Sequence, residues 1–283
     1  MPYNYTITYK ATNSYVEGTN GAIWQFLIVP ELNPSQRPGF FSFKNSLKLP
    51  FEESINGYGF PVFRISTKQH ITEISFEAEF QLVKQEVNPF DFKERKSEKE
   101  VYDTLRGLSF RTDYESFLRT TALTMLPKSF QDYFHFDEAK SLFENLYDLN
   151  SRIHHDFQFK PDVTDVSSKL ETVLKLKAGV CQDFAHLFCA IAKAKGVPTR
   201  YVSGYLHQGS GYLGDSQMHA WVESFLPGIG WKGFDPTNNL LTDHHHIKVC
   251  HGKDYTDCAP LKGVIFTLGE NETKHQIEMV SNQ

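Results

Sequence analysis

The sequence has little cysteine and no excess of basic residues, and each shortage excludes a class of protein. Only 4 of the 283 residues are cysteine, too few for a disulfide framework in a chain of this length. The net charge is −5 and no basic stripe is present, which argues against nucleic acid as a partner. No window approaches the roughly 18 consecutive apolar residues of a membrane-spanning helix. We therefore expect neither a nucleic-acid nor a membrane partner.

The start of the sequence also lacks the pattern of a signal peptide. Residues 1–10 read MPYNYTITYK, without a basic start and an apolar stretch. We accordingly expect a cytoplasmic protein in which most thiols are free. The 40% of apolar residues allow a sizeable core, and the 14% of aromatic residues favour β-structure. Nothing in the composition sets the oligomeric state.

Residues 1–90 have the pattern of an antiparallel β-domain, which we expect to resemble a sandwich. Its clearest strand runs from Ile74 to Leu82, where apolar and polar side chains alternate. A period of two is typical of a strand with one buried face and one exposed face. Gly, Pro and Asn lie between such runs, as turns require.

Helical patterns replace strand patterns after residue 90. We expect a helical linker region over residues 91–135, in which Thr112 and Glu115 have the spacing of a capping box at the start of a helix. Residues 136–283 then combine helical and strand patterns. The chain as a whole is predicted to be an α+β protein.

Cys181 begins a predicted helix that runs to about Lys195 and is followed by Gly196. Unpaired N–H groups and the helix dipole put partial positive charge at a helix N-terminus, which favours a thiolate and can bind an oxyanion. Cys181 shares a helix face with Phe184 and Phe188, so its thiol should point toward a packed sheet. Taken by itself, a cysteine in this position is more often a small buried core residue.

A predicted hairpin supplies two partners for that thiol. His219 lies on a strand-like segment, Pro227 and Gly228 mark a turn, and the chain then returns to Asp235. A turn centred near Pro227 would pair His219 directly with Asp235 on one face of the hairpin. A carboxylate that binds an imidazole fixes its tautomer, so that the other ring nitrogen can take a proton from a thiol. The pattern predicts Cys181 as nucleophile, His219 as base and Asp235 as the group that orients the base.

Four segments, GVCQDFAHL, RYVSGYL, MHAWVE and GWKGFDPTNN, together resemble the core of the transglutaminase-like superfamily in its bacterial branch. The resemblance implies a papain-like fold, in which a helix bearing Cys181 packs on an antiparallel sheet bearing His219 and Asp235. It implies the same three catalytic roles, with no metal or other cofactor. It also implies that residues 1–90 are the β-domain that often precedes this core, and that residues 136–283 are the catalytic core.

The oxyanion site is the part of the family pattern that does not carry over. Animal transglutaminases are said to use a Trp upstream of the Cys as a donor, but this chain has no Trp between Trp24 and Trp221. Gln182 and Trp221 are candidate oxyanion or substrate contacts beside the Cys181 backbone N–H. A polar residue adjacent to the cysteine, such as Gln182, more often caps the helix or faces solvent.

The predicted chemistry is thiol-dependent acyl transfer on a peptide or amide substrate. Hydrolysis, as in a cysteine protease or amidase, is the favoured outcome because water is abundant and no amine site is visible. Crosslinking or deamidation of the transglutaminase type is the alternative, since an amine could take the place of water. A non-catalytic binding module on the same fold is an alternative of another class, against which the presence of all three residues argues.

Other candidate groups are discounted. Residues 243–246 (DHHH), with Cys250 and Cys258, do not have the spacing of a common structural zinc site, so we interpret the histidines as a solvated loop. His186 lies about 140° around the helix from Cys181, which makes it a poor candidate for the base.

Overall fold

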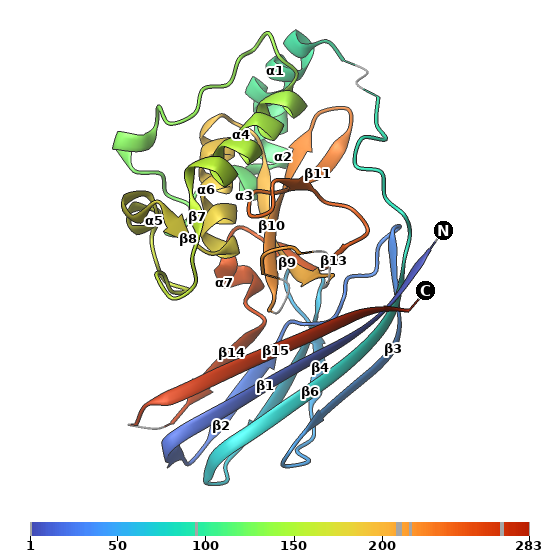
Figure 1. Ribbon diagram of the computed structural model, residues 1–283, viewed down its shortest axis with the longest axis vertical. Coiled ribbons are helices and arrows are strands. Elements are labelled where there is room, and N and C mark those ends of the chain that lie inside the picture. The colour runs from blue at the N-terminus through green and yellow to red at the C-terminus, as the bar shows by residue number, and fades with distance from the viewer. Residues whose placement is uncertain (1, 94–95, 208–210, 215–216, 267–268, 283) are drawn as a thin grey trace.

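A β-rich region and a mixed helical region lie end to end in the molecule (Figure 1). This computed structural model describes residues 2–93, 96–207, 211–214, 217–266 and 269–282. The N- and C-terminal ends lie close together, because the first and last strands pair along their lengths (Figure 1). No helix in the described ranges is long and apolar enough to cross a membrane.

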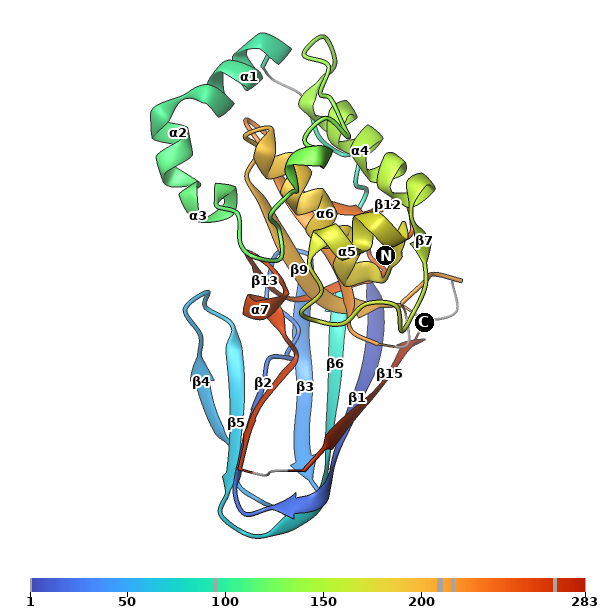
Figure 2. The same ribbon diagram turned by 90° about the vertical axis from the view of Figure 1, so that its left-hand side faces the viewer.

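The β-rich region is a sandwich of two four-stranded antiparallel sheets (Figure 2). The first sheet has the order β15–β1–β6–β3, with strands Asn271–Asn282, Tyr3–Thr19, Ile71–Lys84 and Gln36–Asn45. The second has the order β14–β2–β5–β4, with strands Leu261–Ile265, Ala22–Phe26, Pro61–Thr67 and Glu52–Ile55. Aromatic rings from the two sheets meet between them, for example Phe26 and Phe76 with ring centroids 4.7 Å apart.

The alternation between Ile74 and Leu82 is confirmed in β6. Its apolar residues in this stretch are at most 3% exposed, whereas the residues between them are partly or fully exposed. Because successive strand side chains point to opposite faces, this pattern alone places one face of β6 in the core of the sandwich. The alternation of apolar and polar residues, from which a β-domain at the N-terminus was predicted, therefore reflects the real burial of one strand face.

The C-terminal strands belong to the sandwich, which corrects part of the predicted division of the chain. Residues 136–283 were expected to form the catalytic core, but β15 pairs with β1 and β14 pairs with β2. The chain thus enters the sandwich twice. The physical reason is edge pairing: β1 and β2 each need a second neighbour to satisfy their outer backbone groups, and distant residues supply it.

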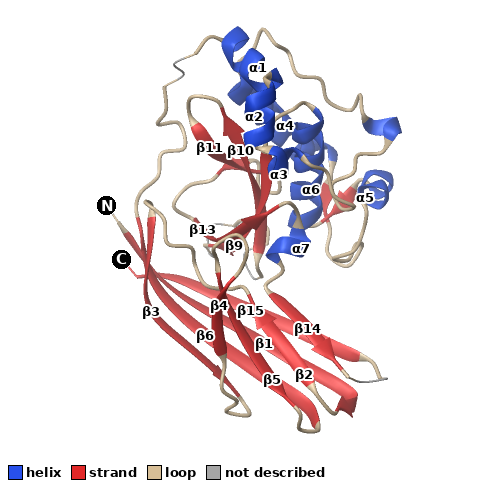
Figure 3. Ribbon diagram, turned by 180° about the vertical axis from the view of Figure 1, so that it is seen from behind, coloured by secondary structure: helices blue, strands red, loops and turns tan. Residues whose placement is uncertain are grey.

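The mixed region is built on a five-stranded antiparallel sheet with helices on its face (Figure 3). The sheet has the order β12–β11–β10–β9–β13, with strands Leu240–Leu241, Gly230–Asp235, His219–Leu226, Thr199–Leu206 and His246–Gly252. The helices are α4 (Leu142–Asp156), α5 (Leu170–Leu176), α6 (Cys181–Ala194) and α7 (Tyr255–Cys258). A short parallel pair, β7 (Gln158–Phe159) with β8 (Ala178–Gly179), precedes α6.

The segment between the two regions is helical, but the predicted start of its helix is wrong. It contains α1 (Glu98–Arg106), α2 (Leu108–Asp113), α3 (Glu115–Leu118) and the 3-10 turn η1 (Lys128–Phe130). The capping box is formed by Ser97 and Glu100 at the start of α1. Thr112 instead lies in the last turn of α2, where its hydroxyl donates to the Leu108 carbonyl at 2.9 Å. A Thr side chain can bind either a free N–H or a carbonyl one turn back, and spacing alone does not separate the two.

Buried hydrogen bonds join the sandwich to the mixed region. The Tyr205 hydroxyl on β9 donates to the Ile28 carbonyl at 2.6 Å. The Gln36 side chain bridges to β13, donating to the Lys248 carbonyl at 2.6 Å and accepting from the Lys248 N–H at 3.1 Å. These bonds between buried groups fix the position of the core sheet on the sandwich.

Candidate active site

Cys181 is the first residue of α6, and a carboxylate secures this end of the helix. The Asp183 carboxylate accepts the Val180 N–H at 2.8 Å and the Thr164 hydroxyl at 2.6 Å. Burial raises the pKa of Asp183, and these two hydrogen bonds oppose that rise. A Cβ atom at Gly179 would lie only 2.6 Å from the same carboxylate, so the turn before the helix depends on glycine there. Asp183 therefore fixes the place of Cys181.

The helix that carries Cys181 is confirmed, although it is buried on more than the one face that was predicted. Every residue from Gln182 to Lys193 is buried, and α6 contacts β10, β9 and α4. Cys181 itself is only partly buried. A helix that is buried on all sides is typical of the centre of a core, so the partly exposed N-terminal end of α6 is the part that a ligand can reach.

His219 and Asp235 lie side by side, and both are fully buried. His219 Nε2 is 2.8 Å from Asp235 Oδ2. Strand β10 pairs with β11 so that Val222 faces Phe234, which puts Asp235 one step further along, opposite Trp221. The predicted register was therefore wrong by two residues, because the turn occupies residues 227–229 and is not centred on Pro227. A shift of two keeps both side chains on the same face, so the contact survives as a diagonal pair.

Asp235 accepts five hydrogen bonds, which fixes the protons around it. Oδ1 accepts the Thr237 and Asn238 N–H groups, at 3.0 and 3.3 Å. Oδ2 accepts His219 Nε2, the Asn238 side-chain amide at 2.9 Å and His246 Nε2 at 3.3 Å. Burial would raise the pKa of Asp235, but the charge and hydrogen bond of His219, with help from His246, hold it well below its usual range. An ionised carboxylate only accepts, so His219 Nε2 must carry a proton.

The other nitrogen of His219, Nδ1, faces Cys181. A Cβ atom at Gly214 would lie 2.8 Å from His219 Nδ1 and 3.9 Å from Cys181 Sγ, so this nitrogen and this sulfur both lie close to one point. Nδ1 has no hydrogen-bond partner of normal geometry among the described residues. Burial lowers the pKa of His219, but Asp235 and then Cys181 more than offset it, and the net pKa is well above the ordinary value. The pair is thus arranged for proton transfer between sulfur and imidazole.

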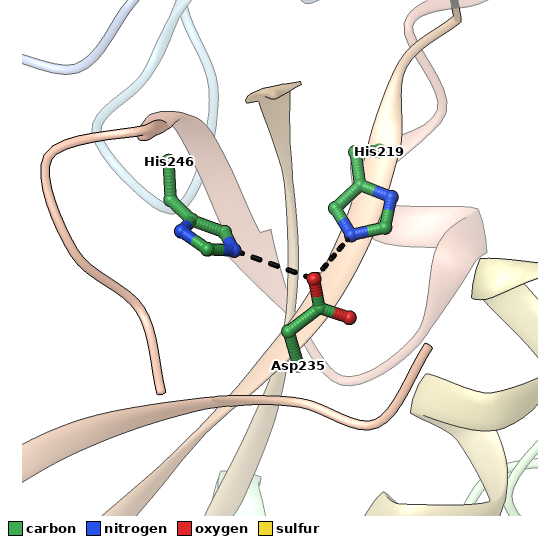
Figure 4. Close-up of side chains that lie close together, drawn as sticks. All are labelled: His219, Asp235 and His246. Carbon is green, nitrogen blue, oxygen red and sulfur yellow. Dashed lines mark hydrogen bonds and ion pairs between the residues drawn. The ribbon is translucent and has the colours of Figure 1, made fainter. Parts of the chain in front are cut away.

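His246, on β13, is the third side chain of this cluster and was missed. Figure 4 shows His219 and His246 approaching the same Asp235 oxygen from two sides. The prediction of a solvated histidine loop is wrong for His246, which is 2% exposed. Strand pairing of β13 with β9 pulls it into the sheet, whereas His244 and His245 stay partly exposed in the turn before it.

Asn238 is the other residue that the sequence analysis missed. Its side chain accepts the Leu213 N–H at 2.8 Å and donates to the Leu213 carbonyl at 3.2 Å while it also contacts Asp235. It therefore joins the backbone at Leu213 to the buried carboxylate. The Asp-Pro-Thr-Asn spacing was a usable signal, since Asp favours turns closed by N–H groups two and three residues on. No local signal pointed to His246.

Two groups of side chains in the described ranges have the composition of metal ligands. They are His219, Asp235 and His246, and separately Asp243, His244 and His245. In the first group the nitrogens that face Asp235 are hydrogen-bond donors, so their lone pairs are not available to an ion. In the second, Asp243 already accepts from His245 Nδ1 at 3.0 Å and contacts His246 Nδ1 at 3.2 Å. In both groups, hydrogen bonds from histidine rings already occupy the carboxylate.

A pocket of about 400 Å³ opens beside Cys181. Its lining is mainly apolar and comes from the 159–166 loop, the start of α6, β9, β10 and the C-terminal segment. The lining residues are Phe159, Pro161, Thr164, Asp165, Val166, Val180, Cys181, Gln182, Tyr201, Ser203, Gly214, Gln217, Met218, Ala220, Tyr255, Pro260 and His275.

The two candidate contact residues differ in position. Gln182 lines the pocket, and its side chain makes no hydrogen bond with another described residue. Trp221 is 1% exposed, is not among the lining residues and packs edge-on against His246 with ring centroids 5.3 Å apart. His186 contacts other groups entirely, since its Nε2 accepts the Tyr255 N–H at 3.1 Å. Gln182 therefore lines the same pocket as Cys181, whereas Trp221 packs against His246 and is not part of that lining.

Comparison with known proteins relates this core to one superfamily. Residues 133–236 match the family model of the transglutaminase-like superfamily, as the sequence motifs implied. A protein from Cytophaga hutchinsonii described as a candidate cysteine protease has the same overall fold. It aligns with a TM-score of 0.78 at 19% identity and covers 100% of this chain and 92% of its own. The α+β fold class is thereby confirmed.

Two curated relatives match part of the chain. An uncharacterized protein of Mycobacterium tuberculosis is 40% identical over 141 residues, which are 47% of this chain and 45% of that protein. A protein-glutamine gamma-glutamyltransferase of Pseudomonas aeruginosa is 32% identical over 104 residues, which are 34% of this chain and 16% of that protein. The chain thus spans less than half the length of these relatives.

Proposed function

We propose that this protein is a thiol-dependent acyl-transfer enzyme that hydrolyses a peptide or amide bond. The observation that carries the proposal is the convergence of Cys181 Sγ and His219 Nδ1 on one point at the wall of a pocket. The transglutaminase-like core and its likeness to a candidate cysteine protease support the same class of chemistry. In this proposal Cys181 is the nucleophile, His219 the base and Asp235 the residue that orients it.

The proposed reaction has two halves. His219 Nδ1 takes the thiol proton, the Cys181 sulfur attacks the carbonyl carbon, and a tetrahedral intermediate forms. His219 then gives the proton to the leaving amine, which leaves a thioester on Cys181. Water attacks the thioester with His219 as base, the carboxylic acid is released, and the thiol is restored. Asp235 stabilises the imidazolium of each half and keeps the Nε2 proton in place.

The oxyanion has two proposed donors. The Cys181 backbone N–H lies at the N-terminus of α6, where helix N–H groups have no partner within the helix. The Gln182 side-chain amide lines the same pocket. Donors aimed at the developing negative charge stabilise the transition state more than the substrate.

Transfer to an amine is a second candidate outcome. The observation in its favour is the partial similarity to a protein named as a protein-glutamine gamma-glutamyltransferase. The thioester would be the same, and only the acceptor would differ. The two outcomes can be separated by incubating the protein with an acyl-donor peptide, with and without monodansylcadaverine, and identifying the products by mass spectrometry. We expect the free acid to dominate; a dominant amine adduct would instead assign the protein to the transferases.

The chemistry itself is tested by selective labelling of Cys181. The intact protein is treated with iodoacetamide from pH 5 to 9, and modification of each of the four cysteines is followed by peptide mass spectrometry. We expect Cys181 to react faster than the other three cysteines at pH 6, because the imidazolium of His219 favours the thiolate. His219→Gln should remove most of this difference in rate. Equal reactivity of Cys181 with and without His219 would support the non-catalytic binding module.

A further inference from the structure

The sandwich contributes a side chain to the pocket that contains Cys181. His275 lies on β15, paired with Ala11 of β1, and is one of the lining residues. Tyr255 and Pro260, from the segment that leads back to the sandwich, line the pocket beside it. The pocket is therefore assembled from both regions, and its wall includes residues more than seventy positions after the proposed nucleophile along the chain.

The protonation of His275 is set by a buried tyrosine. The Tyr9 hydroxyl and His275 Nδ1 are 3.0 Å apart, and Tyr9 is fully buried. Burial raises the pKa of Tyr9, so its hydroxyl keeps its proton, and burial lowers the pKa of His275, so its ring is neutral at pH 7. If Nδ1 carried the ring proton, the buried hydroxyl proton would lose its only partner among the described residues, and an unpaired buried donor is costly. Tyr9 therefore donates to Nδ1, and the ring proton is on Nε2.

The Nε2–H group of His275 is a donor available to a ligand. Nδ1 is turned to Tyr9, and Nε2 makes no hydrogen bond with another described residue. The pocket wall around it is apolar or neutral, apart from Asp165, whose carboxylate accepts from Ser167 and Ser168. A neutral donor in an apolar pocket suits an uncharged acceptor such as a backbone carbonyl, because a buried unpaired charge would be costly there.

We propose that His275 forms an acyl-donor subsite, in which its Nε2–H binds a backbone carbonyl of an uncharged, apolar peptide segment attached to the scissile carbonyl. This inference rests on the proposed function of Cys181. It gives the sandwich a direct part in substrate choice. It also makes Tyr9 a positioning residue, because the phenol fixes the tautomer that His275 needs.

Two electrophiles of different size test the subsite. Chloroacetamide needs only the Cys181 thiol, whereas an N-acetylated dipeptidyl chloromethyl ketone with apolar side chains must also fill the pocket. Second-order rates of Cys181 modification are measured for the intact chain and for His275→Ala, His275→Gln and Tyr9→Phe. Gln276→Ala is the matched control, since Gln276 is the next residue on β15 and is exposed.

The expected result is a selective loss. His275→Ala should slow the peptidyl reagent about tenfold, the effect of one lost hydrogen bond, and leave the chloroacetamide rate unchanged. His275→Gln should restore part of the rate, Tyr9→Phe should lower it by less than His275→Ala, and Gln276→Ala should change neither rate. Equal peptidyl rates in the intact chain and His275→Ala, or a parallel fall with both reagents, would overturn the subsite. Absence of Cys181 labelling in the intact chain would overturn the proposed function, and the subsite with it.

Discussion

The sandwich and the core sheet bury different kinds of side chain. Between its sheets the sandwich buries rings, such as Phe41 and Phe63 with centroids 4.9 Å apart. The core sheet buries His219, Asp235 and His246 at 2% exposure or less. Rings gain from any close packing, whereas buried polar groups are costly unless each has its partner. The sandwich should therefore respond gradually to substitution and the core sheet abruptly.

The largest effect is expected at the cysteines of α6, where the comparison can be made within one helix. Cys181→Ala should lower turnover about 10⁴-fold or more with little change in Tm, because it removes the proposed nucleophile. Cys189→Ala should cost roughly 1–2 kcal/mol of stability and leave turnover within about twofold, because Cys189 is fully buried and its loss only creates a cavity. Peptide hydrolysis and urea unfolding measure the two effects. A Cys189→Ala variant that loses activity while it stays folded would contradict this division.

The next effect is expected in the sandwich, at Phe76. Its ring packs against Phe26 and Trp24 and is 1% exposed. Phe76→Ala should lower the free energy of unfolding by about 4 kcal/mol, and Phe76→Leu by roughly 1–2 kcal/mol, because the smaller cavity is more easily filled. At a temperature where both variants are folded, the chloroacetamide rate of Cys181 should match the intact protein. A graded loss of that rate along the series would show that sandwich packing controls the site.

Sequence patterns predict some parts of the sandwich better than others, depending on whether the signal is local. The period-two alternation in β6 predicted a buried sheet face because burial of apolar side chains is a local, repeated requirement. The return of β14 and β15 to the sandwich had no local sign, since either strand could have paired with the core sheet. Partner choice between strands is decided by which edge remains open once the other strands are in place.

The site shows the same limit. Cys181, His219 and Asp235 could be named from motifs and helix geometry, and the hairpin argument put His219 and Asp235 on one face despite a register error of two residues. The contact of His246 with Asp235 joins β13 to β11, which are not neighbours in the sheet. No spacing rule links two such strands. The position of His275 in the pocket wall is still harder to predict, because it depends on how the sandwich and the core sheet pack against each other.

The next effect, intermediate in size, is the pH dependence that the buried polar groups of the core sheet should give to the free energy of unfolding. The pKa of His219 is raised on folding, so its pairing with Asp235 stabilises the protein fully below the unfolded pKa of about 6.5 and less as pH rises toward the folded pKa. In a Cys181→Ala background, where no thiol can give its proton to His219, the protein should therefore lose on the order of 1–3 kcal/mol between pH 6 and pH 9 relative to the same chain with His219→Gln. Urea unfolding of both proteins at each pH measures the difference. Parallel curves would mean that His219 is not cationic in the folded protein at neutral pH.

The smallest effect, at His246, tests whether the buried polar cluster acts as one unit. His246 supplies one of the five hydrogen bonds to Asp235, and the longest of those to Oδ2. His246→Gln should lower kcat about tenfold and leave KM unchanged, because Asp235 would keep its other donors but hold His219 less firmly. His245→Gln is the matched control, since His245 contacts Asp243 and not Asp235, and should stay within about twofold. Equal losses in both variants would mean that the whole turn is disturbed. An unchanged kcat in His246→Gln would mean that four hydrogen bonds already fix Asp235, and that His246 is held in the cluster for packing against Trp221.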